Sequence, residues 1–281
     1  MKTKDIAWEL RFWLQRIRPP RSSQGIQTED GFSMSKQVKL DETSALYYVD
    51  FIFSGKGYRF YFSEELKDLA PFALERLFTY RAFAQLRLQN KPVIDIGSFI
   101  GDSALFFALR GARSVVALEP SSRFCAIASV NVERNGMGGL IHVVNEGAGK
   151  SGFAQVPVDV SKRAEDPRAS VHREWRSSGR DGVRINSLGD IAERFDPLAD
   201  TVLKVNCEGC EYDLILGASR VELRRFPEIM VEYHYGSGAL TRKLEESGFS
   251  VLVTQNRLEL NRSFSDPRLE IGLLYARRLA E

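Results

Sequence analysis

The chain has 281 residues, of which 43% are hydrophobic and 27% charged, which is an ordinary composition for a globular protein. This composition excludes a disordered or collagen-like chain, and three cysteines are too few for a disulfide scaffold. A net charge of +2 is too balanced to indicate wholesale nucleic-acid binding. No apolar run approaches the roughly 20 residues that span a bilayer, and the N-terminus lacks the pattern of a signal peptide. We therefore expect a cytoplasmic protein without a stable nucleic-acid partner.

Residues 1–40 are predicted to form an amphipathic helix followed by a polar linker. The helix has apolar residues at helical spacing and ends before two prolines. Its apolar positions are Ile6, Leu10, Trp13, Leu14 and Ile17. The segment carries eight basic and four acidic residues. Two interpretations stay open: the helix packs against the body or against a second subunit in a homodimer, or residues 1–20 contact a membrane surface.

Residues 41–90 are predicted to form a β-hairpin and helices packed on the core. Strands at 51–53 and 58–62 flank a glycine-bearing turn. Ser63 is expected to begin a helix, and Pro71 to begin a second helical piece that runs to about Gln89. This N-terminal α+β extension contains no motif that indicates a function.

Residues 91–281 alternate between apolar runs and amphipathic segments, which predicts an α/β domain with a mostly parallel sheet covered by helices on both faces. Strands are expected at 93–96, 114–118, 141–145, 202–206, 228–233, 249–253 and 271–276. Helices are expected at 102–110, 122–135, 187–195, 211–223 and 238–247. No helix separates the last two strands, so the final strand should be antiparallel. Residues 150–185 lack periodicity and are expected to be a basic surface excursion.

The segment D95-IGSFIGDS is the strongest sign of a ligand. A strand ends in an acid, and a glycine-bearing turn then leads into a helix N-terminus that can bind an anion. Glu119 ends the next strand, where a carboxylate can accept hydrogen bonds from a ribose. The spacing lacks the second close glycine of a dinucleotide fingerprint, and Asp95 would favour a cationic amino group over a pyrophosphate. S-adenosylmethionine carries the required ribose, amino group and carboxylate.

This loop, VALEP around Glu119 and NVERN at Asn131–Asn135 resemble class I S-adenosylmethionine-dependent methyltransferases. The segments LKVNCEGCEYDLILGA, IMVEYH and LEESGFSVLV make the chain similar to the FkbM family in particular, over about Pro92–Ala276. The resemblance implies a Rossmann-like, seven-stranded sheet in the order 3-2-1-4-5-7-6 with S-adenosyl-L-methionine as cofactor. The expected cofactor-binding residues are Asp95, Gly97, Ser98, Phe99, Gly101, Asp102, Ser103, Glu119, Pro120, Glu146, Gly147, Ala148 and Asn206.

A second motif, K204-VNCEGCE, follows the fourth strand, where the transferred methyl group would lie. The usual family form is K-I-D-V-E-G-x-E, so Asn206 replaces an aspartate. An amide cannot accept a proton from a hydroxyl, although it can position one. We therefore expect catalysis to involve Lys204, Asn206, Glu208 and His234, with His234 as the base and Glu208 as the second choice. The unperturbed pKa of histidine, about 6.5, suits this role near neutral pH.

Two metal hypotheses and a redox hypothesis compete with this interpretation. Asn206, Glu208, Glu232 and His234 offer oxygen and nitrogen ligands for a divalent cation. Cys207 and Cys210 have the spacing of a zinc or redox pair, but no second cysteine pair completes a zinc site. We assign no residue as a metal ligand, and the divalent-cation set stays an open alternative.

The sequence predicts an enzyme that transfers a methyl group from S-adenosylmethionine to an oxygen of a sugar, glycan or natural product. One alternative is a non-catalytic S-adenosylmethionine-binding scaffold, which the replacement at Asn206 favours. The other is an RNA methyltransferase that uses the basic segment 163–184.

Overall fold

A computed structural model describes residues 31–78, 83, 85–155, 176–177, 182–195, 197–255 and 270–280. The helix predicted within residues 1–20 lies outside these ranges, as does most of the predicted basic segment. None of the helices in the described ranges is long and apolar enough to cross a membrane.

The central feature is a seven-stranded sheet in the order β14-β15-β13-β12-β5-β6-β7. Counted along the chain from β5, this is the predicted order 3-2-1-4-5-7-6. As predicted, the strand last in sequence is antiparallel to both of its neighbours, and the other neighbouring pairs are parallel. The strands are β5 (Pro92–Ile96), β6 (Ser114–Leu118), β7 (Ile141–Val144), β12 (Val202–Val205), β13 (Glu228–Tyr233), β14 (Phe249–Gln255) and β15 (Gly272–Arg278).

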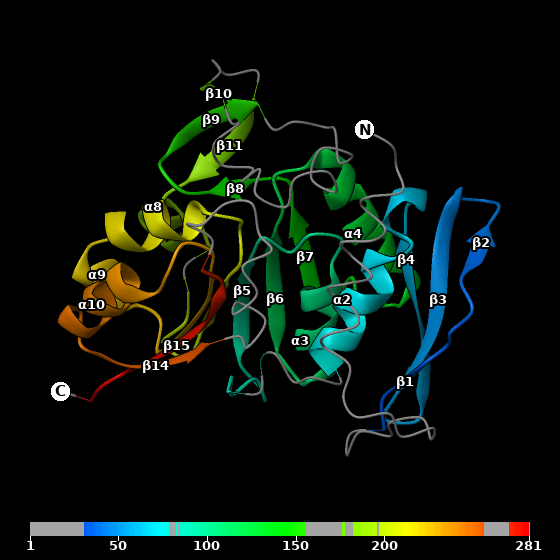
Figure 1. The fold of residues 1–281 in the computed structure, drawn as a ribbon, viewed down its shortest axis with the longest axis horizontal. Coiled ribbons are helices and arrows are strands. Elements are labelled where there is room, and N and C mark those ends of the chain that lie inside the picture. The colour runs from blue at the N-terminus through cyan, green and yellow to red at the C-terminus, as the bar shows by residue number, and fades with distance from the viewer. Residues whose placement is uncertain are drawn as a thin grey trace.

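Helices cover both faces of this sheet, and each face has its own apolar core. One core joins α2, α3 and α4 to the N-terminal strands, and the other joins α7 to α10 to the sheet. Figure 1 shows α2 and α3 on one side of β5 and α8 to α10 on the other. The helices are α2 (Leu69–Phe78), α3 (Asp102–Leu109), α4 (Ser122–Arg134), α7 (Leu188–Phe195), α8 (Cys210–Gly217), α9 (Arg220–Leu223) and α10 (Gly238–Glu246).

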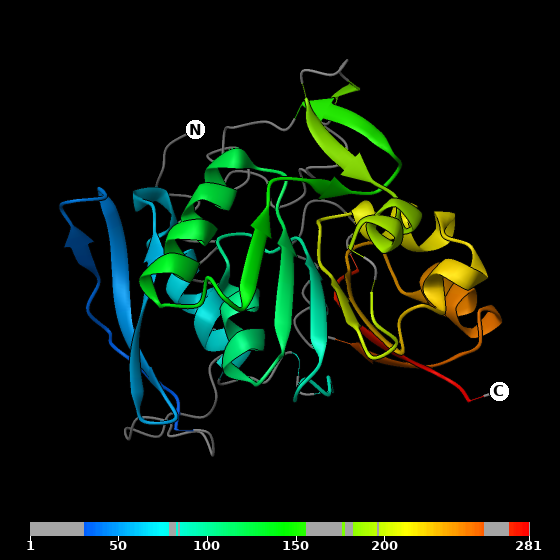
Figure 2. The ribbon, with the colours of Figure 1, turned by 180° about the vertical axis from the view of Figure 1, so that it is seen from behind.

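The N-terminal extension is a small antiparallel sheet packed beside α4, at the edge of the molecule opposite β14 (Figures 1 and 2). The buried side chain of Asn131 on α4 joins this sheet to the domain. Its amide oxygen accepts a hydrogen bond from the backbone N–H of Tyr61 (2.7 Å), and its amide nitrogen donates to the Tyr61 carbonyl (2.9 Å). Its strands are β1 (Ser33–Met34), β2 (Lys39–Asp41), β3 (Leu46–Phe53) and β4 (Lys56–Phe62), followed by the short helix η1 (Glu64–Leu66). The sheet thus includes residues that the sequence assigns to a linker, while the division into three segments stays a prediction.

Three expectations about local structure are wrong. The helix predicted over 211–223 is two helices, because Ser219 caps α9 in a capping box with Glu222. The helix predicted to reach Gln89 ends at Phe78, and residues 85–90 form turns and irregular backbone. Ser63 precedes only one 3-10 turn, and its side chain makes no cap hydrogen bond.

The segment expected to be a plain surface excursion contains strands. β9 (Gly152–Gln155), β10 (Arg176–Ser177) and β11 (Val183–Asn186) form a second sheet with β8 (Gly147–Ala148). Figure 1 shows this sheet above the end of the central sheet where β7 finishes. It therefore lies next to the edge at which the parallel strands end, where ligands of open α/β sheets bind.

Candidate active site

The turn after β5 must be glycine because the chain passes directly against the end of β12. Gly97 has φ +74°, and a Cβ placed on it would lie 1.7 Å from the carbonyl oxygen of Asn206. Gly101, at φ +88°, is the N-cap of α3, and a Cβ placed on it would lie 3.3 Å from Ala128. The first glycine therefore brings the two predicted motifs together, and the second starts the helix whose free N–H groups face the turn.

Glu119 connects this turn to the end of β6. Its two carboxylate oxygens accept hydrogen bonds from the backbone N–H groups of Phe99 (3.0 Å) and Ser121 (2.9 Å). Phe99 has a positive φ of 50°, and its ring contacts Phe124 edge to face. A carboxylate oxygen can accept more than one hydrogen bond, so these bonds do not conflict with the predicted contact with a ribose.

Asp95 has a different environment from the one its predicted role requires. Its carboxylate is fully buried, lies 2.7 Å from the Lys204 ammonium, and accepts a 2.6 Å hydrogen bond from Ser103. Lys204 also donates to the carbonyl of Gly97 (2.9 Å), so it holds the turn against β12. Direct contacts of Asp95 with a cofactor and of Lys204 with a substrate stay predictions.

Asp102, the first residue of α3, lies beside this buried pair. Burial raises the pKa of Asp102 to about 6, although the Lys204 charge lowers it. The nearby charge of Asp95 acts in the same direction as burial. Near neutral pH the start of α3 therefore carries a carboxyl group whose charge is only weakly favoured.

The predicted adenine border lies where β7 leads into β8. Asn145 donates from its side chain to the carbonyls of Glu119 (2.9 Å) and Pro120 (3.1 Å). Glu146 accepts from the amide of Asn186 (2.9 Å) and pairs with Arg194, while residues 147–148 pair with β11. The structure thus brings Pro120 and residues 146–148 to the same edge of the sheet as Glu119. Ser98 also lies at this edge, fully buried, and its hydroxyl has no partner among the described residues.

Asn206 follows β12 and presents an unused acceptor. Its side-chain N–H group donates to Glu232 (3.1 Å), which fixes the orientation of the amide because a carboxylate can only accept. The amide oxygen is buried and has no hydrogen-bond partner among the described residues. Arg76 of α2 pairs with the same Glu232 carboxylate. A buried acceptor without a partner costs stability unless a ligand supplies a donor, so this oxygen is a candidate ligand contact.

His234 follows β13 and lies between two carboxylates. Its Nδ1 is 2.6 Å from Oε1 of the fully buried Glu211, and its Nε2 is 3.3 Å from Oε2 of the half-exposed Glu208. Burial alone would lower the pKa of His234, but Glu208 and Glu211 together raise it well above its usual value. The surroundings of His234 therefore favour its protonated form, which differs from the unperturbed pKa assumed from the sequence.

The structure also brings together residues that the sequence did not select. Arg76 comes from the N-terminal extension, and its sequence surroundings gave no sign of a role. Glu211 is absent from the predicted site residues, but it orients His234 and accepts from the backbone of Gly209 (2.8 Å). Since Arg76 already neutralises Glu232, the geometry adds no support to the divalent-cation hypothesis.

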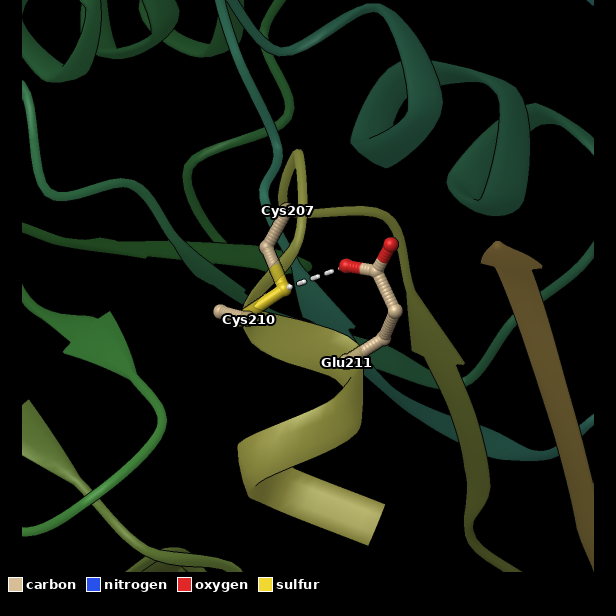
Figure 3. A group of neighbouring side chains, drawn as sticks. All are labelled: Cys207, Cys210 and Glu211. Atoms are coloured by element: carbon tan, nitrogen blue, oxygen red, sulfur yellow. Dashed lines mark hydrogen bonds between the residues drawn. A yellow bond between two sulfur atoms is a disulfide. The ribbon is translucent and has the colours of Figure 1, made fainter. Parts of the chain in front are cut away.

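Cys207 and Cys210 form a disulfide at the start of α8. Figure 3 shows the pair beside Glu211, whose carboxylate points at the Cys207 sulfur. Among the described residues, the potential metal-ligand atoms of Cys207, Cys210 and Glu211 lie within 4.8 Å of one another. The remaining cysteine, Cys125, is a free thiol on α4.

The model of the methyltransferase FkbM domain matches residues 95–251, more than half of the chain. The chain belongs to this family. It is a methyltransferase with a Rossmann-like fold, and its methyl donor is S-adenosylmethionine, as the resemblance predicts.

Solved methyltransferase structures match the chain at low identity. A precorrin-6y C5,15-methyltransferase of Geobacter metallireducens is 14% identical with a TM-score of 0.40, covering 71% of this chain and 87% of that one. M. capricolum TrmK in complex with S-adenosyl-homocysteine is 10% identical with a TM-score of 0.45, covering 72% and 69%. A search of curated proteins found no match. The functional conclusion rests on the family match.

The residues at the ends of β5, β6 and β12 fit this cofactor. The close approach at Gly97 joins the cofactor loop to the end of β12, and a carboxylate such as Glu119 is a suitable acceptor for ribose hydroxyls. The unpartnered Asn206 oxygen can accept from an ammonium or a hydroxyl. When bound, the cofactor supplies an electrophilic methyl group, and the protein supplies alignment and a route for the acceptor proton.

Proposed function

We propose that this FkbM-domain methyltransferase methylates a hydroxyl oxygen of a sugar, glycan or natural product. The observation that carries the proposal is the placement of His234 between Glu211 and Glu208, beside Asn206. An oxygen acceptor must lose a proton as it gains the methyl group. A histidine oriented by a buried carboxylate, at the sheet edge where the cofactor binds, is suited to receive that proton.

The proposed division of labour follows the hydrogen bonds. Glu211 holds Nδ1 of His234, which leaves Nε2 to face Glu208 and, with substrate bound, the acceptor hydroxyl. The Asn206 oxygen accepts a hydrogen bond from the ligand and thereby fixes its position. Arg76 and Glu232 hold the Asn206 amide in place. With cofactor and acceptor bound, Nε2 of His234 would take up the hydroxyl proton, while the cofactor would supply the methyl group and be released as a neutral thioether.

The raised pKa of His234 sets the pH dependence of this proposal. Only the neutral ring accepts a proton, and burial opposes but does not cancel the effect of the two carboxylates that raise the pKa. Activity should therefore increase as the pH passes the raised pKa. The ascending limb of the pH–rate profile is therefore expected at a higher pH than the value of about 6.5 that an unperturbed histidine implies.

The test is a panel of acceptors incubated with the protein and isotopically labelled S-adenosylmethionine. The panel contains monosaccharides, oligosaccharides, hydroxylated polyketides and, as the alternative acceptor, transfer RNA. A new methyl ether, identified by mass spectrometry and stable to mild alkali, supports the proposal. Label on RNA alone would favour the RNA methyltransferase, and cofactor binding without any transfer would favour the scaffold.

We also propose that residues 1–20 form a homodimer contact or a peripheral membrane contact and are not needed for cofactor binding. The deletion should end at residue 30, because buried Phe32 stacks on Phe78 with ring centroids 4.7 Å apart. Light scattering and liposome sedimentation of the shortened chain separate the two contacts. Loss of cofactor binding in a folded 31–281 chain would contradict the proposal.

A further inference from the structure

The disulfide lies in the turn that connects β12 to α8, inside the predicted active site. The Cα atoms of Cys207 and Cys210 are 5.4 Å apart, and Cys207 follows Asn206 directly. The third cysteine, Cys125, is half-buried on α4, where burial and the Glu119 charge raise its pKa to about 11. Cys125 is therefore a poor thiolate and a poor partner for exchange, so redox chemistry at neutral pH belongs to the pair.

The two sulfurs have different accessibility. Cys207 is partly exposed, whereas Cys210 is fully buried and is the first residue of α8. An attacking thiolate reaches Cys207 more easily, and the thiolate that leaves is Cys210, at the positive end of an eight-residue helix. This asymmetry favours reversible exchange over a permanently closed bond.

Glu211 links the disulfide to the proposed base. Its Oε2 lies 3.4 Å from the Cys207 sulfur and accepts from the Gly209 N–H, while its Oε1 holds His234 Nδ1 at 2.6 Å. Figure 3 shows this carboxylate aimed at the sulfur pair. The same buried side chain therefore contacts both the redox group and the histidine.

Reduction changes the chemistry of this contact. While the disulfide is closed, Cys207 has no S–H, so the 3.4 Å contact with Glu211 cannot be a hydrogen bond. After reduction the Cys207 thiol can donate to Oε2, which draws negative charge away from the carboxylate that orients His234. Opening the bond also frees the turn that carries Asn206 and Glu208.

We propose that Cys207 and Cys210 form a reversible dithiol–disulfide site that controls the acceptor side of the active site, with the closed form as the more active state. The regulatory part of this inference rests on the proposed function; the redox site itself does not. The reductant is a dithiol, either a small molecule or a protein.

The exchange is balanced in two steps. A thiolate of the dithiol attacks Cys207 Sγ, forms a mixed disulfide and releases Cys210 as a thiolate that takes up a proton. The second thiol of the reductant then attacks its own sulfur in the mixed disulfide and releases Cys207, which is also protonated. Two electrons pass to the protein, and the reductant leaves as a disulfide.

The test equilibrates the full-length protein in buffers of defined dithiothreitol and glutathione ratios. Samples are quenched in acid, denatured, alkylated with N-ethylmaleimide and weighed intact. The closed form should gain one label, on Cys125, and the reduced form three, one on each cysteine. Cys125→Ala is the matched control, and it should remove one label from both forms without shifting the midpoint.

The coupling is read from the ring signals of the three histidines by nuclear magnetic resonance, with His234→Gln as the assignment control. The His234 signal should move with the same midpoint as the mass change. Cys207→Ser, which cannot close the disulfide, should abolish that movement in every buffer. With an accepted substrate, at a pH where His234 is neutral in both forms, reduction should slow turnover about tenfold, because the freed turn no longer fixes the position of Asn206.

Several results would overturn the inference. These are one label even under the strongest reductant, three labels even under oxidising conditions, or a His234 signal that ignores the redox state. Protection of the reduced cysteines by one equivalent of Zn²⁺ under all the buffers would show a metal site instead. Calorimetry of S-adenosylmethionine and the acceptor panel test the proposed function separately, because labelling needs no acceptor.

Discussion

The two sides of the active site are built in different ways. The cofactor side uses backbone of one short loop, in which two glycines and a helix start lie within ten residues of β5. The acceptor side uses side chains from four separate segments, namely Arg76, Asn206, Glu211 and His234. Local spacing predicts the first kind of site, whereas only the folded sheet brings the second kind together.

The two sides also differ in charge. On the cofactor side the buried Asp95 is neutralised by Lys204, and Glu119 is satisfied by backbone N–H groups. On the acceptor side an imidazole lies between two carboxylates, and an amide oxygen has no partner in the part of the chain that the structure describes. Above the pKa of Asp102, about 6, the cofactor side should therefore tolerate pH changes better, and the acceptor side should carry the pH dependence of the reaction.

The largest effect is expected where the two sides meet, at Gly97. In Gly97→Ala the new Cβ would overlap the Asn206 carbonyl at 1.7 Å, and alanine is also disfavoured at φ +74°. Overpacking and the left-handed backbone together should cost about 2–5 kcal/mol of unfolding free energy and remove cofactor binding. Urea unfolding and calorimetry measure both.

Gly136→Ala is the matched control for this substitution. Gly136 has a similar φ of +69° but no atom within 4 Å of the added Cβ. It should lose only about 1–2 kcal/mol, the backbone cost alone. If both variants lost the same stability, the contact between Gly97 and Asn206 would not matter, and the two sides would be less tightly joined than the structure indicates.

The second effect concerns the proposed base. His234→Gln should reduce turnover about 10²–10⁴-fold while leaving cofactor affinity nearly unchanged, because His234 faces the acceptor side. Initial rates and calorimetry on the same sample provide the comparison. Full activity in this variant would leave alignment of donor and acceptor as the main source of catalysis.

The sequence predicted the sheet, its order and the residues of the cofactor loop because those depend on local patterns. Gly97 and Glu119 each follow an apolar strand at a spacing that any such fold must keep. Arg76 was missed because its helix comes from the extension, more than 150 residues from Glu232, and only tertiary packing makes them partners. The break between α8 and α9 was readable, since Ser219 and Glu222 have capping-box spacing.

The third effect tests whether the extension belongs to the acceptor side. Arg76→Met removes the ion pair with the buried Glu232 carboxylate and leaves the hydrogen bond from Asn206 to that carboxylate in place. We expect a loss of about 2–4 kcal/mol in unfolding free energy, because removing one partner of a largely buried pair leaves an uncompensated charge. The KM for the acceptor should increase more than the Kd for the cofactor. Arg76→Lys keeps the charge and should restore most of the stability, unlike an effect that arises from packing alone.

The fourth effect tests the cofactor side alone. Glu119→Ala removes the acceptor for Phe99 and Ser121 and, on the prediction above, for the ribose. Cofactor affinity should fall by about 1–3 kcal/mol, the loss of hydrogen bonds to a charged acceptor. Calorimetry measures it, and an unchanged Kd would remove Glu119 from the site. The pH dependence of turnover at saturating cofactor should stay the same, since this side does not carry it.

The smallest effect is a shift of the pH–rate profile in Glu208→Gln. Burial lowers the pKa of His234, and the charge of Glu208 is the largest influence that raises it. Without that charge the pKa should fall, so the ascending limb should move to lower pH, and solvent screening of the half-exposed Glu208 keeps this movement small. Added salt should shift the wild-type limb in the same direction. Glu193→Gln on α7 makes the same charge change on an exposed helix position and should leave the profile in place.

The sign of the pKa shift of His234 also fixes its effect on stability. The pairing with the carboxylates stabilises the fold fully below the unfolded pKa, and this contribution is lost as the pH rises through the folded pKa. A limb that moves upward in Glu208→Gln would mean that the base is another group and that His234 acts only as a protonated donor.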